Sequence, residues 1–154
     1  MNQIASLLPH DNVVANLDAS SKKRVFEQVG ILFENHQSVA RSTVYDALFA
    51  REKLGSTGLG QGIAIPHGKS DCINKLVAAF GVSRSGVQFD SLDGEPAHLF
   101  FLLVAPEDAA GPHLKALARI SRLLKDKHFR DSLQNAIDEK QLVKIMRDED
   151  ERRH

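Results

Sequence analysis

Residues 55–69, GSTGLGQGIAIPHGK, contain the residue types most suited to chemistry. His67 stands between Pro66 and Gly68, so its neighbours are rigid on one side and small on the other. Pro66 favours an extended Ile65, which predicts that His67 is presented at the tip of a short strand. A neutral imidazole, with an ordinary pKa of about 6.5, keeps a lone pair that can attack phosphorus. A loop histidine with no function has the same signature, so residue type alone leaves both interpretations open.

Glycines precede this histidine at alternate positions. Gly58, Gly60 and Gly62 leave the segment without side chains there, which predicts a close approach by another backbone or by a partner protein. The segment is not a Walker A loop, because no Gly-Lys-Ser/Thr opens a helix after it. No G-x-G-x-x-G follows a first strand either, so dinucleotide binding has no support.

Two more groups could bind an anion near His67. Pro112 suits the first position of a helix and would place His113 in the first turn, beside amides with no intrahelical partner. The positive end of the helix dipole lies at the same place. Arg51 would add a planar cation at the end of an earlier helix. A histidine at a helix start and an arginine at a helix end are each also typical of an ordinary protein surface. Together with His67 they suit phosphoryl transfer, in which cations and hydrogen-bond donors stabilise the negative charge on the equatorial oxygens.

Apolar spacing predicts the elements that position these groups. The expected helices are 20–35 with Ser20 or Ser21 as cap, a helix capped by Ser42 that stops at Gly55, and 113–125, 129–135 and 139–146. The expected strands are 63–65, 76–82 and 98–104, with a turn at 83–86 and a short edge strand at 87–89. Residues 146–154 are charged and are expected to fray. This order predicts an α/β single-domain layered sandwich with one central sheet.

Composition narrows the function classes. The 154 residues suit one domain, and 20 basic residues balance 20 acidic ones, so no overall field would attract nucleic acid or a membrane. Cys72 is the only cysteine, which excludes an internal disulfide and predicts a buried or half-buried bystander. The first residues lack the pattern of a secretory signal, and the longest apolar run, 99–105, is too short to span a bilayer as a helix. We therefore expect a cytoplasmic protein without direct membrane insertion.

A resemblance to a known family is carried by the motif GSTGLGQGIAIPHGK. It resembles the active-site motif of the fructose/mannitol-type IIA proteins of the bacterial phosphotransferase system, most closely the nitrogen-regulatory branch (IIA-Ntr). Further similar segments are LLPHDNVVANLDASSKKRVFEQVG, AREKLGST and HLKALARISRLLKD. The resemblance thus spans nearly the whole chain and implies a single EIIA type-2 domain over 1–154, with a central mixed β-sheet flanked by helices.

The same resemblance implies roles for individual residues. His67 falls on the histidine that is phosphorylated at Nε2, His113 on the second histidine that contacts the phosphoryl group, and Arg51 on the arginine that helps to hold the phosphate. The supporting loop comprises Ser56, Thr57, Gly58, Gly60, Gly62, Pro66 and Gly68. No cofactor or metal is implied.

The implied donor is an HPr-type phosphocarrier (NPr), which docks on an apolar rim around its acceptor histidine. In the nitrogen-regulatory branch the phosphorylation state regulates partner proteins, such as potassium-transport or sensor-kinase systems. The alternative is a stand-alone IIA component that passes phosphate to a IIB domain of a fructose/mannitol-type sugar permease.

Rival functions have less support from the residues. A metal hydrolase lacks an H-E-x-x-H motif or closely spaced paired ligands. A pure interaction module, with His67 incidental, would take up no phosphate from a phosphorylated donor. Nucleic-acid binding is unsupported, because the basic residues of the 113–125 segment are interpreted as the solvated side of a helix: Lys115, Arg119, Arg122 and Lys125.

Overall fold

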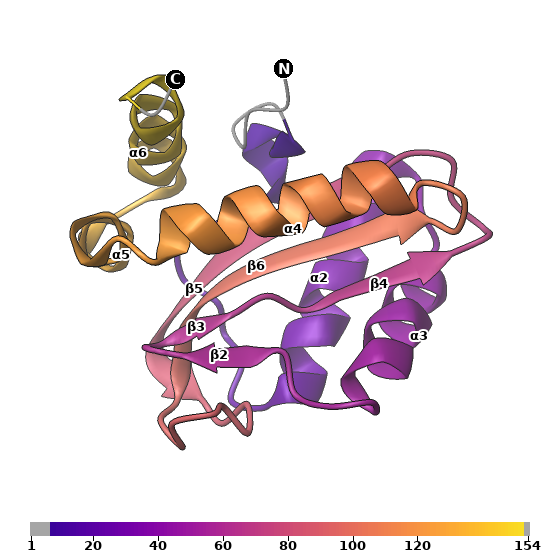
Figure 1. Ribbon diagram of the computed structural model, residues 1–154, viewed down its shortest axis with the longest axis horizontal. Coiled ribbons are helices and arrows are strands. Elements are labelled where there is room, and N and C mark those ends of the chain that lie inside the picture. The colour runs from indigo at the N-terminus through magenta and orange to yellow at the C-terminus, as the bar shows by residue number, and fades with distance from the viewer. Residues whose placement is uncertain (1–6, 153–154) are drawn as a thin grey trace.

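A mixed β-sheet forms the middle layer of the computed structural model, which describes residues 7–152 (Figure 1). Its six strands are β1 (Val13–Val14), β2 (Gly58–Gly60), β3 (Ile63–Ala64), β4 (His67–Ser70), β5 (Val77–Val87) and β6 (Ala97–Pro106). They run in the order β1-β5-β6-β3-β2, and β4 also pairs with β6. The central pair β5–β6 is antiparallel, whereas β3 and β4 are parallel to β6. The predicted mixed sheet is confirmed.

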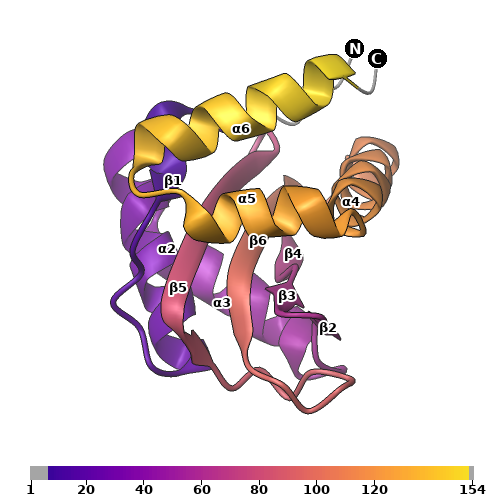
Figure 2. The ribbon, with the colours of Figure 1, turned by 90° about the vertical axis from the view of Figure 1, so that its left-hand side faces the viewer.

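Helices cover both faces of the sheet (Figure 2). The structure has a 3₁₀ turn, η1 (His10–Asn12), and the helices α2 (Lys22–Gln37), α3 (Arg41–Glu52), α4 (Ala110–Leu124), α5 (Lys127–Asn135) and α6 (Glu139–Arg152). Side chains of α2 and α3 share one apolar core with the sheet, and those of α4, α5 and α6 share the other. Because β6 is buried on both faces, its residues are apolar at consecutive positions, as the sequence predicted.

The strand that carries His67 is interrupted. β3 and β4 both lie along β6, with Ile63 opposite Leu99 and His67 opposite Leu103. The break falls at the Ile65–Pro66 step, where proline has no amide hydrogen and the Ile65 amide bonds to the Thr57 carbonyl at 3.1 Å. His67 therefore begins a strand, so its predicted place at the tip of strand 63–65 is wrong.

Two other local predictions are wrong. The expected turn at 83–86 lies within β5, which continues to Val87 through a register shift, and no separate strand covers 87–89. Residue 86 is a glycine at φ +87°, and an irregularity of this kind lets a strand bend without ending. The helix α3 begins before Ser42, with Ala40 as its N-cap.

The C-terminal segment was expected to fray from residue 146, but α6 remains helical to Arg152. Asp150 is 1% exposed and pairs with Arg119 of α4 at 3.3 Å, and Arg152 pairs with Glu149 at 2.8 Å. Paired charges can be buried where isolated ones cannot, so the charged end packs instead of fraying. Arg119 is consequently not on the solvated side of α4. Residues 153–154 of the expected tail lie outside the described residues.

Helix α2 gives a measurable test of the predicted capping. The Ser21 hydroxyl accepts a hydrogen bond from the Arg24 amide at 3.2 Å, as an N-cap does. We expect Ser21→Ala to lower the free energy of unfolding by about 1 kcal/mol, measured by urea denaturation. Ser20→Ala is the matched control, because Ser20 is exposed and precedes the cap. Equal losses in the two variants would contradict the capping role.

Candidate active site

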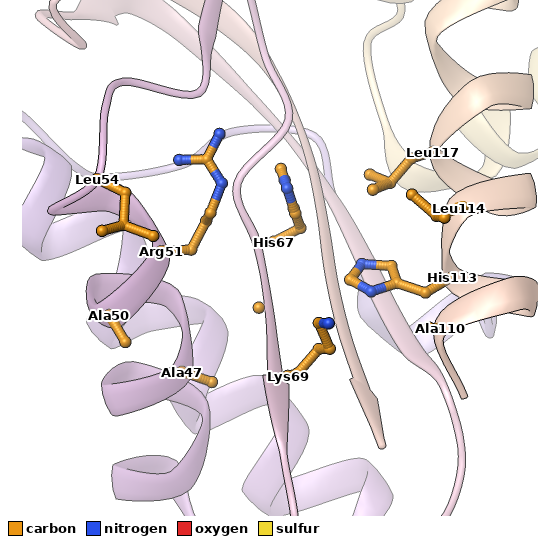
Figure 3. A pocket seen from close by; sticks show the side chains of 11 residues that line it. Ala47, Ala50, Arg51, Leu54, His67, Lys69, Ala110, His113, Leu114 and Leu117 are labelled. Atoms are coloured by element: carbon orange, nitrogen blue, oxygen red, sulfur yellow. The ribbon is translucent and has the colours of Figure 1, made fainter. Parts of the chain in front are cut away.

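A pocket of about 400 Å³ opens between α3, β4 and α4 (Figure 3). It is lined by Ala47, Ala50, Arg51, Leu54, His67, Gly68, Lys69, Ala110, His113, Leu114 and Leu117. The three residues predicted to act on a phosphoryl group, His67, His113 and Arg51, are thus brought together from elements that are distant in the sequence.

His67 is half-buried, and its backbone neighbour determines its tautomer. Nδ1 lies 2.8 Å from the Ile65 carbonyl oxygen, and a carbonyl can only accept, so Nδ1 carries the proton. Nε2 is therefore the ring nitrogen with the free lone pair. Ile65 offers this oxygen because it sits at the break between β3 and β4.

The charge state of His67 follows from its surroundings. Burial lowers its pKa below the ordinary value, and the hydrogen bond to Ile65 opposes this shift in part. The nearby Arg51 cation also lowers the pKa, whereas the Glu52 carboxylate raises it. The imidazole is consequently neutral at pH 7 and able to act as a nucleophile.

His113 faces His67 from the other side of the pocket. The ring centroids are 5.6 Å apart with an interplanar angle of 76°, and His113 is only 4% exposed. Its Nε2 is buried and has no hydrogen-bond partner among residues 7–152. Burial, assisted by His67 and Lys69, lowers the pKa of His113 to about 4. This ring is therefore neutral at pH 7 and lines the pocket with an Nε2 that is unpaired within the described part of the chain.

The start of α4 differs from the expected one. The helix begins at Ala110, two residues before Pro112, and the His113 amide already bonds to the Ala109 carbonyl at 3.1 Å. His113 therefore offers its side chain to the pocket, and the prediction that it lies beside open amides in the first turn is wrong. Leu114, the next residue of α4, is 67% exposed at the pocket rim.

Two cations line the pocket. Arg51, in the last turn of α3 as predicted, donates from Nη1 to the Gly55 carbonyl at 2.8 Å. Lys69 was not singled out from the sequence. It lies two residues after His67 on β4, and alternate residues of a strand share one face. A strand predicted at residues 67–70 would have placed Lys69 on the same face as His67.

Most residues of the supporting loop lie away from the pocket. Gly58, Gly60 and Gly62 belong to the β2–β3 hairpin and do not line the pocket. A Cβ on Gly58 would lie 2.5 Å from the Ser91 hydroxyl and 3.1 Å from the Ser91 Cα, so the predicted close approach by another backbone is confirmed at this glycine. Gly68 is the glycine beside His67, and a Cβ there would lie 2.4 Å from the Ala47 carbonyl oxygen.

The remaining loop residues act as supports. The Ser56 hydroxyl donates to the Phe89 carbonyl, and the Thr57 hydroxyl donates to Glu52 at 2.6 Å. Pro66 is buried, and its carbonyl accepts the Leu103 amide at 3.0 Å. None of the three lines the pocket.

The chain belongs to the family described as "Phosphoenolpyruvate-dependent sugar phosphotransferase system, EIIA 2", whose model matches residues 6–149. Along its whole length it is similar to the nitrogen-regulatory proteins of that family. It is 36% identical to the nitrogen regulatory protein of Bradyrhizobium diazoefficiens, over 93% of this chain and 94% of that one. The crystal structure of the nitrogen regulatory protein IIA-Ntr from Neisseria meningitidis matches with a TM-score of 0.87 and 41% identity, over 93% and 98% of the two chains.

A longer relative is a sugar-specific protein. The chain is 38% identical to the PTS system fructose-specific EIIABC component of Bacillus subtilis over 96% of its own length, but it spans only 24% of that protein. The family predicted from the motif at 55–69, and its α/β fold, are confirmed.

Three further features of residues 7–152 concern membranes, metals and Cys72. No helix in this range is long and apolar enough to cross a membrane. The same range contains no group of three or more His, Cys, Asp or Glu that could hold a metal ion. Cys72 is exposed, so its predicted burial is wrong.

The two neutral histidines predict how stability depends on pH. The pKa of His113 is about 4 in the folded protein and about 6.5 in the unfolded chain. As the pH falls, the unfolded chain therefore takes up a proton at this residue before the folded protein does. The stability due to neutral His113 is complete above pH 6.5 and is lost as the pH falls toward 4. The lowered pKa of His67 acts in the same direction. We expect the free energy of unfolding, from urea titrations across this window, to fall less steeply in His113→Gln; an unchanged slope would contradict the assignment.

Proposed function

We propose that this protein is a phosphocarrier of the nitrogen-regulatory phosphotransferase system and accepts a phosphoryl group on His67 Nε2. The observation that carries the proposal is the Nδ1 contact with the Ile65 carbonyl at 2.8 Å, which leaves Nε2 as the nucleophile. That nitrogen belongs to a pocket that also contains His113, Arg51 and Lys69.

The transfer is an in-line displacement. The Nε2 lone pair forms a bond to phosphorus while the bond between phosphorus and the donor's histidine nitrogen breaks, and the electron pair of that bond returns to the donor ring. The Nδ1 proton stays in place, and its hydrogen bond to Ile65 spreads the positive charge that develops on the His67 ring. Arg51, Lys69 and the His113 ring surround the position of the equatorial oxygens.

The rim of the pocket supports a protein donor. Leu54 is 83% exposed on the α3 side, and Leu114 is 67% exposed on the α4 side. An exposed apolar rim around a charged centre is typical of a site that another protein covers. The family acts with an HPr-type phosphocarrier, and in this chain the proposed donor is the nitrogen-branch carrier NPr.

Regulation is the proposed outcome of phosphorylation. The support is the similarity to nitrogen regulatory relatives, of which the Bradyrhizobium diazoefficiens protein is matched over 94% of its length at 36% identity. In this proposal the phosphorylation state of His67 controls binding to partners such as potassium-transport or sensor-kinase systems. Transfer to a IIB domain of a fructose/mannitol-type permease is the alternative, supported by the 38% identity to the fructose-specific protein.

Reconstituted phosphotransfer tests the proposal. The purified protein is mixed with phosphoenolpyruvate, the general donor enzyme of the system and an HPr-type carrier, and its mass is followed. We expect a gain of one phosphoryl group that is labile in acid and maps to His67. No gain, or a gain on another residue, would refute the proposal. Adding a fructose-type IIB domain then separates the outcomes, because loss of the label to that domain would favour the sugar-permease alternative.

A further inference from the structure

A buried acidic side chain lies behind the pocket without a role in the proposed transfer. Glu52, the last residue of α3, is 8% exposed and directly follows Arg51. Its carboxylate accepts three hydrogen bonds: from the Thr57 hydroxyl at 2.6 Å, from the Thr57 amide at 3.1 Å and from Lys22 Nζ at 2.9 Å. A buried carboxylate is costly unless it is paired, so this arrangement needs all of these partners.

Thr57 leads from this carboxylate to the acceptor histidine. Its carbonyl accepts the Ile65 amide at 3.1 Å, and the Ile65 carbonyl accepts the His67 Nδ1 proton at 2.8 Å. The Ile65 peptide sits at the strand break between β3 and β4, so the ladder to β6 does not hold it there. Thr57 is 3% exposed and is bonded to Glu52 at both its amide and its hydroxyl.

We propose that Glu52 is a positioning residue for phosphoryl acceptance, acting through Thr57 and Ile65 to fix the tautomer and orientation of the His67 ring. Misplacement of a reacting group by about 1 Å can slow a reaction roughly a hundredfold, so a fixed Ile65 carbonyl matters to the rate. The proposal rests on the proposed function of His67, but the ring tautomer can be measured without any phosphotransfer.

The charge of Glu52 supplies a second effect. The groups that face His67 are Arg51 of α3, Lys69 of β4, His113 of α4 and the Glu52 carboxylate. Glu52 raises the pKa of His67 and Arg51 lowers it. Removing only the Glu52 charge therefore lowers this pKa, which a role limited to packing would not do.

The test uses Glu52→Gln and Thr57→Val in the full chain. Glu52→Gln keeps the shape of the side chain. Its new NH2 group is a hydrogen-bond donor, so it cannot accept from the donors of Thr57 and Lys22 as the carboxylate does. We expect the maximal rate of phosphoryl uptake to fall about tenfold with little change in the KM for the carrier, because the carrier docks on the rim. The rate profile should also move to lower pH, and the ¹⁵N shifts of His67 should show loss of the single Nδ1–H tautomer. Thr57→Val should lower the rate similarly, and Thr57→Ser should restore it.

Asp150→Asn is the matched control, since Asp150 is also a buried, ion-paired carboxylate but lies on α6. Its rate per folded molecule and its His67 shifts should match those of the unsubstituted protein. Unchanged rate, pH profile and tautomer in Glu52→Gln would overturn the proposal, as would equal effects in Asp150→Asn. If Glu52→Gln does not fold, Thr57→Val decides. If the unsubstituted protein takes up no phosphoryl group, the proposed function fails, and the ¹⁵N shifts still decide the role of Glu52.

Discussion

Replacement of His67 by alanine is expected to abolish phosphoryl uptake, with a fall in rate of at least about a thousandfold. The reason is that Nε2 of this ring is the proposed bonding atom, and the cationic side chains of Arg51 and Lys69 are donors without a lone pair to replace it. His113 cannot substitute directly, because its ring is 4% exposed, whereas His67 is half-buried and lines the opening. Mass spectrometry after incubation with the phosphorylated carrier measures the loss.

The chain contains a close control for this variant. His98 on β6 is also half-buried and also contacts a backbone carbonyl through Nδ1, that of Ser83 at 2.9 Å. It does not line the pocket. His98→Ala should therefore keep full uptake, and His113→Ala should slow uptake but leave the acceptor present. Acid-labile phosphate that persists at full rate in His67→Ala would refute the assignment.

The layered fold could be predicted because its signal is continuous along the chain. The runs at 76–82 and 98–104 are apolar at successive positions, which indicates strands covered on both faces. Helices α2, α4 and α5 have apolar residues at helical spacing, and two of them begin at a capping side chain, Ser21 or Asp126. These features are local, so one sequence suffices to find them.

The missed features depend on partners distant in the sequence. Strand β4 reads HGKS and has no apolar alternation, because its identity as a strand comes from pairing with β6. Lys69 was missed for the same reason. The ordered end of α6 depends on Arg119, 31 residues away from Asp150. Proline is favoured at the first position of a helix, but Pro112 is the third residue of α4, so it could not fix the start of this helix.

The site residues also differ in whether the sequence alone could place them. The sequence grouped His67, His113 and Arg51 by residue type and by a family resemblance, and the fold brings all three to one pocket. The glycines of the motif were interpreted together, although they act separately. Gly58 fits against Ser91, whereas Gly68 fits against α3, because the two glycines lie on different strands, β2 and β4.

Gly68→Ala is expected to have the largest effect on folding among the small substitutions near the pocket. The added Cβ would lie 2.4 Å from the Ala47 carbonyl oxygen and 2.7 Å from its carbonyl carbon. Both are backbone atoms of α3, so no side-chain rotation relieves the overlap, and α3 must move away from β4. We expect the free energy of unfolding to fall by about 3 kcal/mol or more, measured by urea denaturation.

The displaced helix also carries Arg51, so Gly68→Ala should slow phosphoryl uptake even among molecules that remain folded. Gly111→Ala is the matched control. Gly111 lies in the first turn of α4 and a Cβ there meets nothing within 4 Å. Because alanine favours a helix over glycine by about 1 kcal/mol, this variant should be as stable as the original chain or more so, with uptake unchanged. Similar stability in the two variants would mean that α3 does not pack directly against the Gly68 backbone. Other contacts would then hold α3 and β4 together.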